Sequence, residues 1–132
     1  HRVDRRQRQM CIRDRMMTWP KPIQKPYPPI IVGGGFPYGA RRAISYGDGW
    51  MPIGDRVDVI ELLPRFRQMA AEAGREPDDI PVTSFGLQPE NDLVAKAADA
   101  GIDRVVFGLL PEKAETILPM LDKFSDMVNR YS

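Results

Sequence analysis

The chain has 132 residues and a formal net charge of +1; 42% of its residues are hydrophobic and 28% are charged. These values are typical of one ordinary globular domain. No stretch approaches the roughly 18 consecutive apolar residues of a membrane span, and the single cysteine, Cys11, excludes a disulfide framework. Because Cys11 and His1 are the only soft ligands, we expect no metal site of the usual zinc kind and no Cys–His or Ser–His nucleophile.

The positive charge is concentrated at the start of the chain. Residues 1–15 hold six arginines and two aspartates, a balance of +4, whereas residues 16–132 carry −3. No apolar helical face and no interleaved aromatic residues accompany these arginines, so we expect neither nucleic-acid nor membrane binding. The string Met10 to Arg15 resembles translated sequencing-adapter sequence, and the chain does not begin with Met. We therefore interpret residues 1–15 as a non-native, adapter-like or disordered tail and exclude them from the fold prediction.

The next segment, residues 16–29, contains five prolines and predicts an extended connector. We expect residues 30–132 to form the folded domain. It opens with a β-branched run, Ile30 to Val32, which predicts a buried strand that Gly33-Gly34-Gly35 terminates. A helix is predicted over Ala40 to Tyr46, with Pro37 near its start and Gly47 as its stop.

The remaining elements continue the same alternation of strand and helix. The predicted strands are Asp48 to Pro52, Pro81 to Phe85 and Arg104 to Phe107. The first of the remaining predicted helices is Val57 to Ala73, with a kink or restart at Pro64 and a stop at Gly74. The second is Glu90 to Ala100, which Gly101 stops. The last helix is opened by Pro111 and has a bend at Pro119 and an apolar stripe of Ile117, Leu121, Phe124 and Val128.

Four strand–helix repeats predict a parallel sheet with right-handed crossovers. Two architectures fit this order: a small doubly wound sheet, or half of a (β/α)₈ barrel, which needs about 250 residues when complete. Four parallel strands without closure leave two open edges. A half barrel is therefore expected to be marginally stable alone or to pair with another half.

The first chemical signal is the glycine run between the first strand and the first helix. Backbone N–H groups at a helix N-terminus form an anion site, and glycine lets a phosphate approach the backbone closely. The run is neither a Walker A loop nor the dinucleotide fingerprint, and a tight strand-to-helix turn is the alternative interpretation. Arg41 and Arg42 either add positive charge to a phosphate site or face solvent.

The second signal is Tyr46 to Trp50, where a helix stops, the chain turns and a strand begins within five residues. Asp48 is suited to hold the turn, and Gly49 allows another chain or a ligand to approach closely. Trp50 has two interpretations: it is a core aromatic residue, or it lies toward the site-bearing end of its strand.

Taken together, Pro22 to Gly34, Arg41-Arg42-Ala43 and Gly47 to Trp50 resemble the luciferase-like monooxygenase superfamily, and within it the deazaflavin (coenzyme F(420))-dependent oxidoreductases. Ala100 to Phe107 is similar to the last strand of that family and its lead-in, and the likeness covers Pro20 to Arg130. The resemblance implies an α/β fold, the C-terminal half of a (β/α)₈ TIM barrel with four βα units and parallel strands.

The resemblance also implies a function. The chain would be part of an oxidoreductase or monooxygenase that uses coenzyme F(420), or alternatively FMN, on a small-molecule substrate. The glycine loop, Gly33, Gly34 and Gly35, would hold the cofactor phosphate, and Asp48, Gly49 and Trp50 would belong to the same wall. No catalytic residue is assigned, because family members place the cofactor ring and much of the substrate pocket in their N-terminal half. We expect the isolated chain to bind cofactor weakly and to show no turnover.

Two other classes of protein fit the pattern. One is a non-catalytic half-barrel module that forms homodimers through its open sheet edges, and the other is a small doubly wound phosphate-binding domain. The expected macromolecular partner is a missing N-terminal half barrel or a second copy of the chain. The sequence shows no apolar leader and no anchor motif, so we expect a cytoplasmic location.

Overall fold

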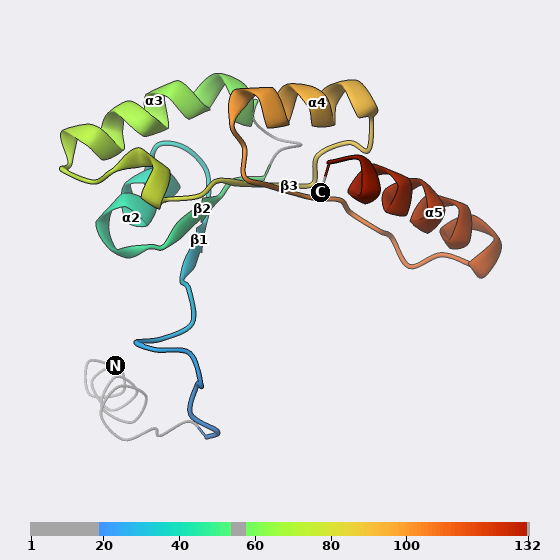
Figure 1. Ribbon diagram of the computed structural model, residues 1–132, viewed down its shortest axis with the longest axis horizontal. Helices are drawn as coiled ribbons and strands as arrows, with labels where there is room; N and C mark the ends of the chain where they lie inside the picture. Colours follow the sequence, from blue (N-terminus) through green and yellow to red (C-terminus); the bar gives the residue numbers. More distant parts are fainter. Residues whose placement is uncertain (1–18, 54–57, 132) are drawn as a thin grey trace, which may run out of the picture.

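The computed structural model describes residues 19–53 and 58–131. Within these ranges four short strands alternate with four helices (Figure 1). In chain order they are β1 (Ile31–Gly33), α2 (Tyr38–Tyr46), β2 (Gly49–Met51), α3 (Val59–Glu72), a 3₁₀ turn η1 (Pro77–Asp79), β3 (Thr83–Phe85), α4 (Asn91–Ala100), β4 (Arg104–Val106) and α5 (Ala114–Tyr131). The predicted mixed α/β alternation is confirmed. The predicted tail, residues 1–15, and the predicted helix start at Val57 lie outside the described residues, and residues 19–30 hold no helix or strand.

The strands lie in the same order in space as in the chain. β1 pairs in parallel with β2, and β3 pairs in parallel with β4. Two parallel bridges, Trp50 to Val82 and Ile53 to Phe85, connect β2 with β3. A doubly wound sheet reverses its strand order at a switch point. The described strands show no such reversal.

The core lies on one side of these strands. Because successive strand residues point to opposite faces, Val32, Trp50 and Val82 share one face, and all three are buried. They form one cluster with the buried side chains of three helices, which include Ala40, Ala43, Ile44, Val59, Leu63, Phe66, Ala70 and Ala97. Helices α2, α3 and α4 therefore cover the same face. The opposite face carries Ile31 and Phe85, which are 36% and 44% exposed.

Helix α2 begins two residues before its predicted start. Pro37 is its N-cap and already has helical dihedral angles, and the N–H of Gly39 donates to the carbonyl of Gly35 at 2.7 Å. Gly47 ends the helix, but in an extended conformation rather than a left-handed one. A Cβ at Gly47 would lie 2.8 Å from Cγ2 of Val32, so this glycine is required by close packing of the helix end against β1.

Helix α3 is continuous through Pro64, so the restart predicted there is not observed. Its first turn is capped by Asp58, whose Oδ1 accepts from the N–H of Ile60 and of Glu61 at 3.0 and 3.2 Å. The buried Leu63 and Phe66 flank Pro64 and hold both halves of the helix on the core. The predicted stops at Gly74, after α3, and Gly101, after α4, are confirmed, because their φ angles of +75° and +86° are left-handed.

Helix α5 begins three residues after Pro111, and two of the four residues of its predicted apolar stripe are exposed. Leu121 is 43% exposed, whereas Met127 is the buried residue of this helix. Phe124 stacks on Phe107 with ring centroids 5.1 Å apart. Figure 1 shows the helix extending away from α3 and α4, so no described element lies along its first half.

Candidate cofactor-binding site

The glycine loop follows directly from the carboxyl end of β1 and leads into α2. Its three carbonyl groups all accept hydrogen bonds. Gly33 accepts from Nη2 of Arg42 at 3.3 Å, Gly34 from Nε1 of Trp50 at 3.0 Å, and Gly35 from the N–H of Gly39 at 2.7 Å. The N–H of Gly35 donates to no acceptor within residues 19–53 and 58–131. The N–H of Gly34 faces β2, because the parallel register pairs Gly33 with Met51. The loop thus has fixed carbonyls and one free donor, which suits an anion.

The three glycines differ in whether packing or backbone conformation requires a glycine at their position. Gly34 has a φ of +117°, so here the tight-turn interpretation holds. A side chain at Gly33 or Gly35 would meet nothing within 4 Å. Neither packing nor backbone conformation therefore explains these two glycines. They leave open space at the carboxyl end of β1, where a phosphate group can approach the backbone.

Gly39, in the first turn of α2, was not singled out from the sequence. A Cβ at this position would overlap the carbonyl group of Gly34. The small residue therefore lets the first turn of α2 sit against the glycine loop. The signal in the sequence is a fourth glycine four residues after Gly35, which is a helical spacing.

Trp50 is fully buried and contacts the glycine loop from the core. Its ring stacks on Phe66 with centroids 4.7 Å apart and lies tilted against Phe36 at 6.4 Å. The core interpretation of Trp50 is therefore confirmed. Its indole N–H also reaches Gly34, so the same side chain connects the core to the loop.

Asp48 and Gly49 lie at the opposite end of β2 from the glycine loop. Asp48 exchanges two hydrogen bonds with Ile30, because its N–H donates to the Ile30 carbonyl and its Oδ2 accepts from the Ile30 N–H, both at 2.8 Å. A Cβ at Gly49 would lie 2.7 Å from Cδ1 of Ile31. Both residues therefore hold the entry of β2 against β1. The structure does not bring them to Gly33, Gly34 and Gly35.

Three arginines lie around the start of α2. Arg42 contacts the loop carbonyl, whereas the guanidinium carbon of Arg41 lies 6.0 Å from the ring of Tyr38. Arg65 of α3, which the sequence gave no reason to select, has its guanidinium carbon 5.2 Å from the ring of Phe36. Arg41, Arg65 and Phe36 line a cleft of about 560 Å³ between α2 and α3. The surroundings of the loop are therefore positively charged, which favours an anionic ligand.

The glycine loop, β1 to β3 and the helices between them fall inside a match to the family model described as luciferase-like monooxygenase, which covers residues 3–89. The chain belongs to the luciferase-like monooxygenase family. It is 30% identical over 114 residues to two mycobacterial proteins, uncharacterized protein Mb0978c of Mycobacterium bovis and uncharacterized protein Rv0953c of Mycobacterium tuberculosis. The match covers 82% of this chain and 38% of each relative, so the chain spans about two fifths of their length.

Members of the luciferase-like family generally use a flavin or a deazaflavin, and both carry a phosphate group. The free N–H of Gly35 and the open space at the glycine loop fit such a group. Within the described residues, no cluster of three or more His, Cys, Asp or Glu side chains could hold a metal ion. No helix of the same residues is long and apolar enough to cross a membrane.

Proposed function

We propose that this chain supplies the phosphate-binding wall of a flavin- or deazaflavin-dependent oxidoreductase, and that its four βα units are the C-terminal half of a (β/α)₈ barrel. The observation that carries the proposal is the glycine loop. It combines the unpaired N–H of Gly35 with two glycines, Gly33 and Gly35, that the chain itself does not require. Barrel enzymes build their sites at the carboxyl ends of the strands, which is where this loop lies.

The strand order supports the barrel half over a doubly wound sheet. Four parallel strands follow one another in chain order, and α2, α3 and α4 pack in one cluster on one face. In a doubly wound sheet, helices cover both faces. In a barrel, all helices lie outside and the other face becomes the interior.

The residues of the loop have distinct tasks in this proposal. The N–H of Gly35 would bind the phosphate, and Arg42 would add positive charge beside it. Trp50 would keep the loop in its binding conformation by holding the Gly34 carbonyl. A bound flavin or deazaflavin supplies the hydride or electron transfer itself. The chain therefore contributes binding and orientation, and we assign it no catalytic acid, base or nucleophile.

Titration of the ¹⁵N-labelled chain tests the phosphate site directly. Coenzyme F(420), FMN and inorganic phosphate are added separately while the backbone amide signals are followed by NMR. We expect saturable shifts of the Gly34 and Gly35 signals with all three ligands, because all three would place a phosphate oxygen at the Gly35 N–H, next to Gly34. Comparison of FMN with coenzyme F(420) then tests which cofactor is preferred; we expect coenzyme F(420).

A matched pair of glycine variants separates binding from folding. Gly35→Ala and Gly108→Ala each add a Cβ where nothing lies within 4 Å, and Gly108 follows β4 at the other edge of the sheet. Gly35→Ala should weaken phosphate binding at least about tenfold, or about 1.4 kcal/mol. Gly108→Ala should leave binding unchanged, and neither variant should lose stability. If the Gly34 and Gly35 signals never shift, the proposed phosphate site is wrong.

The substrate is proposed to be a small molecule that meets the cofactor at the carboxyl ends of the strands. We expect the 132-residue chain alone to bind cofactor weakly and to show no turnover, because only one wall of the site is present. Fluorescence titration with coenzyme F(420) and FMN measures this. Tight binding in the micromolar range, or turnover by the chain alone, would contradict the proposal of a partial site.

A further inference from the structure

The cleft between α2 and α3 contains two arginines that the proposed function does not use. It has a volume of about 560 Å³, and its walls come from the two helices and the residues next to them. Sites for small molecules commonly have volumes of roughly 300–1000 Å³. The charged residues that line the cleft are Arg41 of α2 and Arg65 and Glu72 of α3. The cleft is therefore large enough for a small ligand and holds charged groups to bind it.

No carboxylate neutralises these two arginines. Neither Arg41 nor Arg65 makes a hydrogen bond or an ion pair with any residue that the structure describes. Glu61 lies four residues before Arg65 in α3, a spacing at which the two side chains commonly pair, yet they form no ion pair. The carboxylate of Glu72 accepts instead from Nε2 of Gln68 at 2.9 Å. With two positive groups and one negative group, the lining of the cleft carries a net positive charge.

Aromatic rings position both guanidinium groups. The guanidinium carbon of Arg65 lies 5.2 Å from the centre of the Phe36 ring, and that of Arg41 lies 6.0 Å from the centre of the Tyr38 ring. The Phe36 ring in turn lies 6.4 Å from the ring of the buried Trp50. A ring attracts the positive charge without supplying a carbonyl or carboxylate acceptor. The N–H donors of both guanidinium groups therefore stay available to a ligand.

The cleft is distinct from the glycine loop. Arg42, which follows Arg41 in the chain, donates to the carbonyl of Gly33 and does not line the cleft. Successive residues of a helix point about 100° apart, so the two arginines serve different places. None of the three glycines of the loop lines the cleft either. An anion in the cleft would therefore contact other groups than a phosphate at the loop, and the inference does not rest on the proposed function.

We propose that the cleft between α2 and α3 is a second anion site, in which Arg41 and Arg65 bind the carboxylate or phosphate group of a small molecule. The planar fork of donors on a guanidinium matches two oxygens of either group. Met69, which is half-buried in the same cleft, offers apolar surface to the rest of the molecule. The ligand class is therefore small organic acids and phosphate esters.

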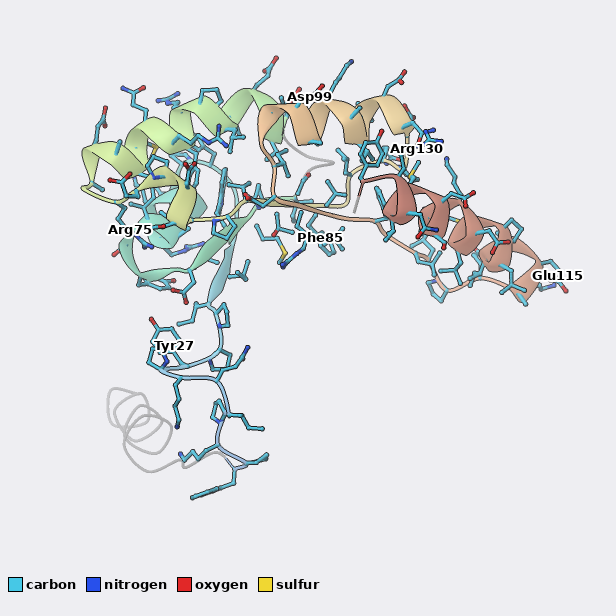
Figure 2. The ribbon with its side chains drawn as sticks, in the orientation of Figure 1. Tyr27, Arg75, Phe85, Asp99, Glu115 and Arg130 are labelled. Carbon is cyan, nitrogen blue, oxygen red and sulfur yellow. The ribbon has the colours of Figure 1, made fainter. Side chains whose placement is uncertain are left out.

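Titration of the ¹⁵N-labelled 132-residue chain with malonate, and separately with inorganic phosphate, tests the site. Sodium chloride keeps the ionic strength constant, and the Nε–H signals of Arg41 and Arg65 report binding. Arg130 is the internal control, because it is exposed, has no ion pair within the described residues and lies on α5, on the other side of the molecule from α2 and α3 (Figure 2). We expect saturable shifts at Arg41 and Arg65 only. A response to only one of the two anions would show whether the site takes carboxylates or phosphates.

Two substitutions of Arg65 separate its charge from its geometry. Arg65→Gln should weaken the binding reported by Arg41 at least about tenfold, because hydrogen bonds from a charged group are lost. Arg65→Lys should weaken it less, since lysine keeps the charge but not the planar fork. Arg130→Gln is the matched control and should leave the affinity unchanged. Circular dichroism of each variant shows whether it has folded, which we expect because both arginines are exposed.

Equal shifts at Arg41, Arg65 and Arg130 would overturn the inference, because the anions would then bind any exposed arginine. Unchanged affinity in folded Arg65→Gln would overturn it as well. Shifts at the two cleft arginines without a response of the Gly35 amide to phosphate would support the cleft and refute only the proposed phosphate loop. A response of Gly35 without one at the cleft arginines would refute the cleft and leave the proposed function standing.

Discussion

At the scale of single residues, Trp50 shows how one side chain can serve both core and site. Its ring is fully buried against Phe66, while its N–H donates to a carbonyl of the glycine loop. Buried tryptophan generally finds a partner for its N–H. Here the partner is the backbone of the loop, so the stability of the core and the conformation of the proposed phosphate site are connected through one hydrogen bond.

Trp50→Phe should therefore cost about 1 kcal/mol of unfolding free energy from the lost hydrogen bond, besides the cost of the smaller ring. It should also weaken phosphate binding, because the Gly34 carbonyl is no longer held. Urea unfolding at one chain concentration and the amide titration measure the two effects. Trp19→Phe is the matched control, since Trp19 is 74% exposed and should change neither quantity. Unaltered phosphate binding by Trp50→Phe would show that the loop does not depend on the indole.

The sequence located the glycine loop and Trp50 but could not separate Asp48 and Gly49 from them. These residues are adjacent to Trp50 in the chain, yet each strand residue advances the chain by about 3.3 Å along the sheet. Asp48 enters β2 while Gly33 leaves β1, so they lie at opposite ends of paired strands. The family resemblance thus grouped Asp48 and Gly49 with the glycine loop, whereas the direction of the strands places them at the other end of β1 and β2.

At the scale of elements, an aspartate fixes the entry of two strands in the same way. The N–H of Asp103 donates to the carbonyl of Val82 at 3.0 Å, and its Oδ2 accepts from the Val82 N–H at 2.8 Å. Asp48 makes the same pair of bonds to Ile30. In each case a helix ends, a glycine follows, and the aspartate sets the register of the next strand on the preceding one.

Asp103→Ala should destabilise the chain more than Asp48→Ala. Val82 is 2% exposed, so its N–H would lose the Asp103 carboxylate and could not bond to water instead, at a cost of about 1–3 kcal/mol. Ile30 is 43% exposed and its N–H can bond to water, so Asp48→Ala should cost about 0.5–1.5 kcal/mol. Urea unfolding gives both values. Asp99→Ala, on the exposed surface of α4, is the control and should stay within about 0.5 kcal/mol. Equal losses for the two strand-entry aspartates would contradict the argument from burial.

Most elements could be predicted because their ends carry local signals. Gly74 and Gly101 adopt left-handed conformations at helix ends, as their positions in the sequence indicate. Gly47 also ends a helix, but for contact with Val32 rather than for its dihedral angles, and that contact is not visible in the sequence. The strands are only three residues long, so their ends depend on pairing with neighbours more than on composition.

At the scale of the whole molecule, the sequence left the half barrel and the doubly wound sheet open. Both have the same alternation of strand and helix, but they differ in the spatial order of the strands and in the faces that the helices cover. The bridge from Trp50 to Val82 places β3 beside β2, which supports the half barrel that we propose. Helices α2, α3 and α4 pack on one face, whereas no residue of α5 belongs to that core cluster. We therefore expect stability to differ between the helices.

We expect the two halves of helix α5 to differ in stability, and hydrogen exchange should reveal the difference. The contacts that dock the helix include three in the described residues: Phe124 stacks on Phe107, Met127 is 3% exposed, and the Tyr131 hydroxyl donates to the Asn91 carbonyl at 3.2 Å. All three lie in its second half, whereas Leu118 in the first half is 58% exposed. Amides protected by few buried contacts exchange through local opening. We therefore expect amides of residues 117–120 to exchange much faster than those of 63–70 in α3, with residues 124–130 in between. Equal protection along α5 would contradict this expectation. It would mean that a partner covers the first half of the helix around Leu118.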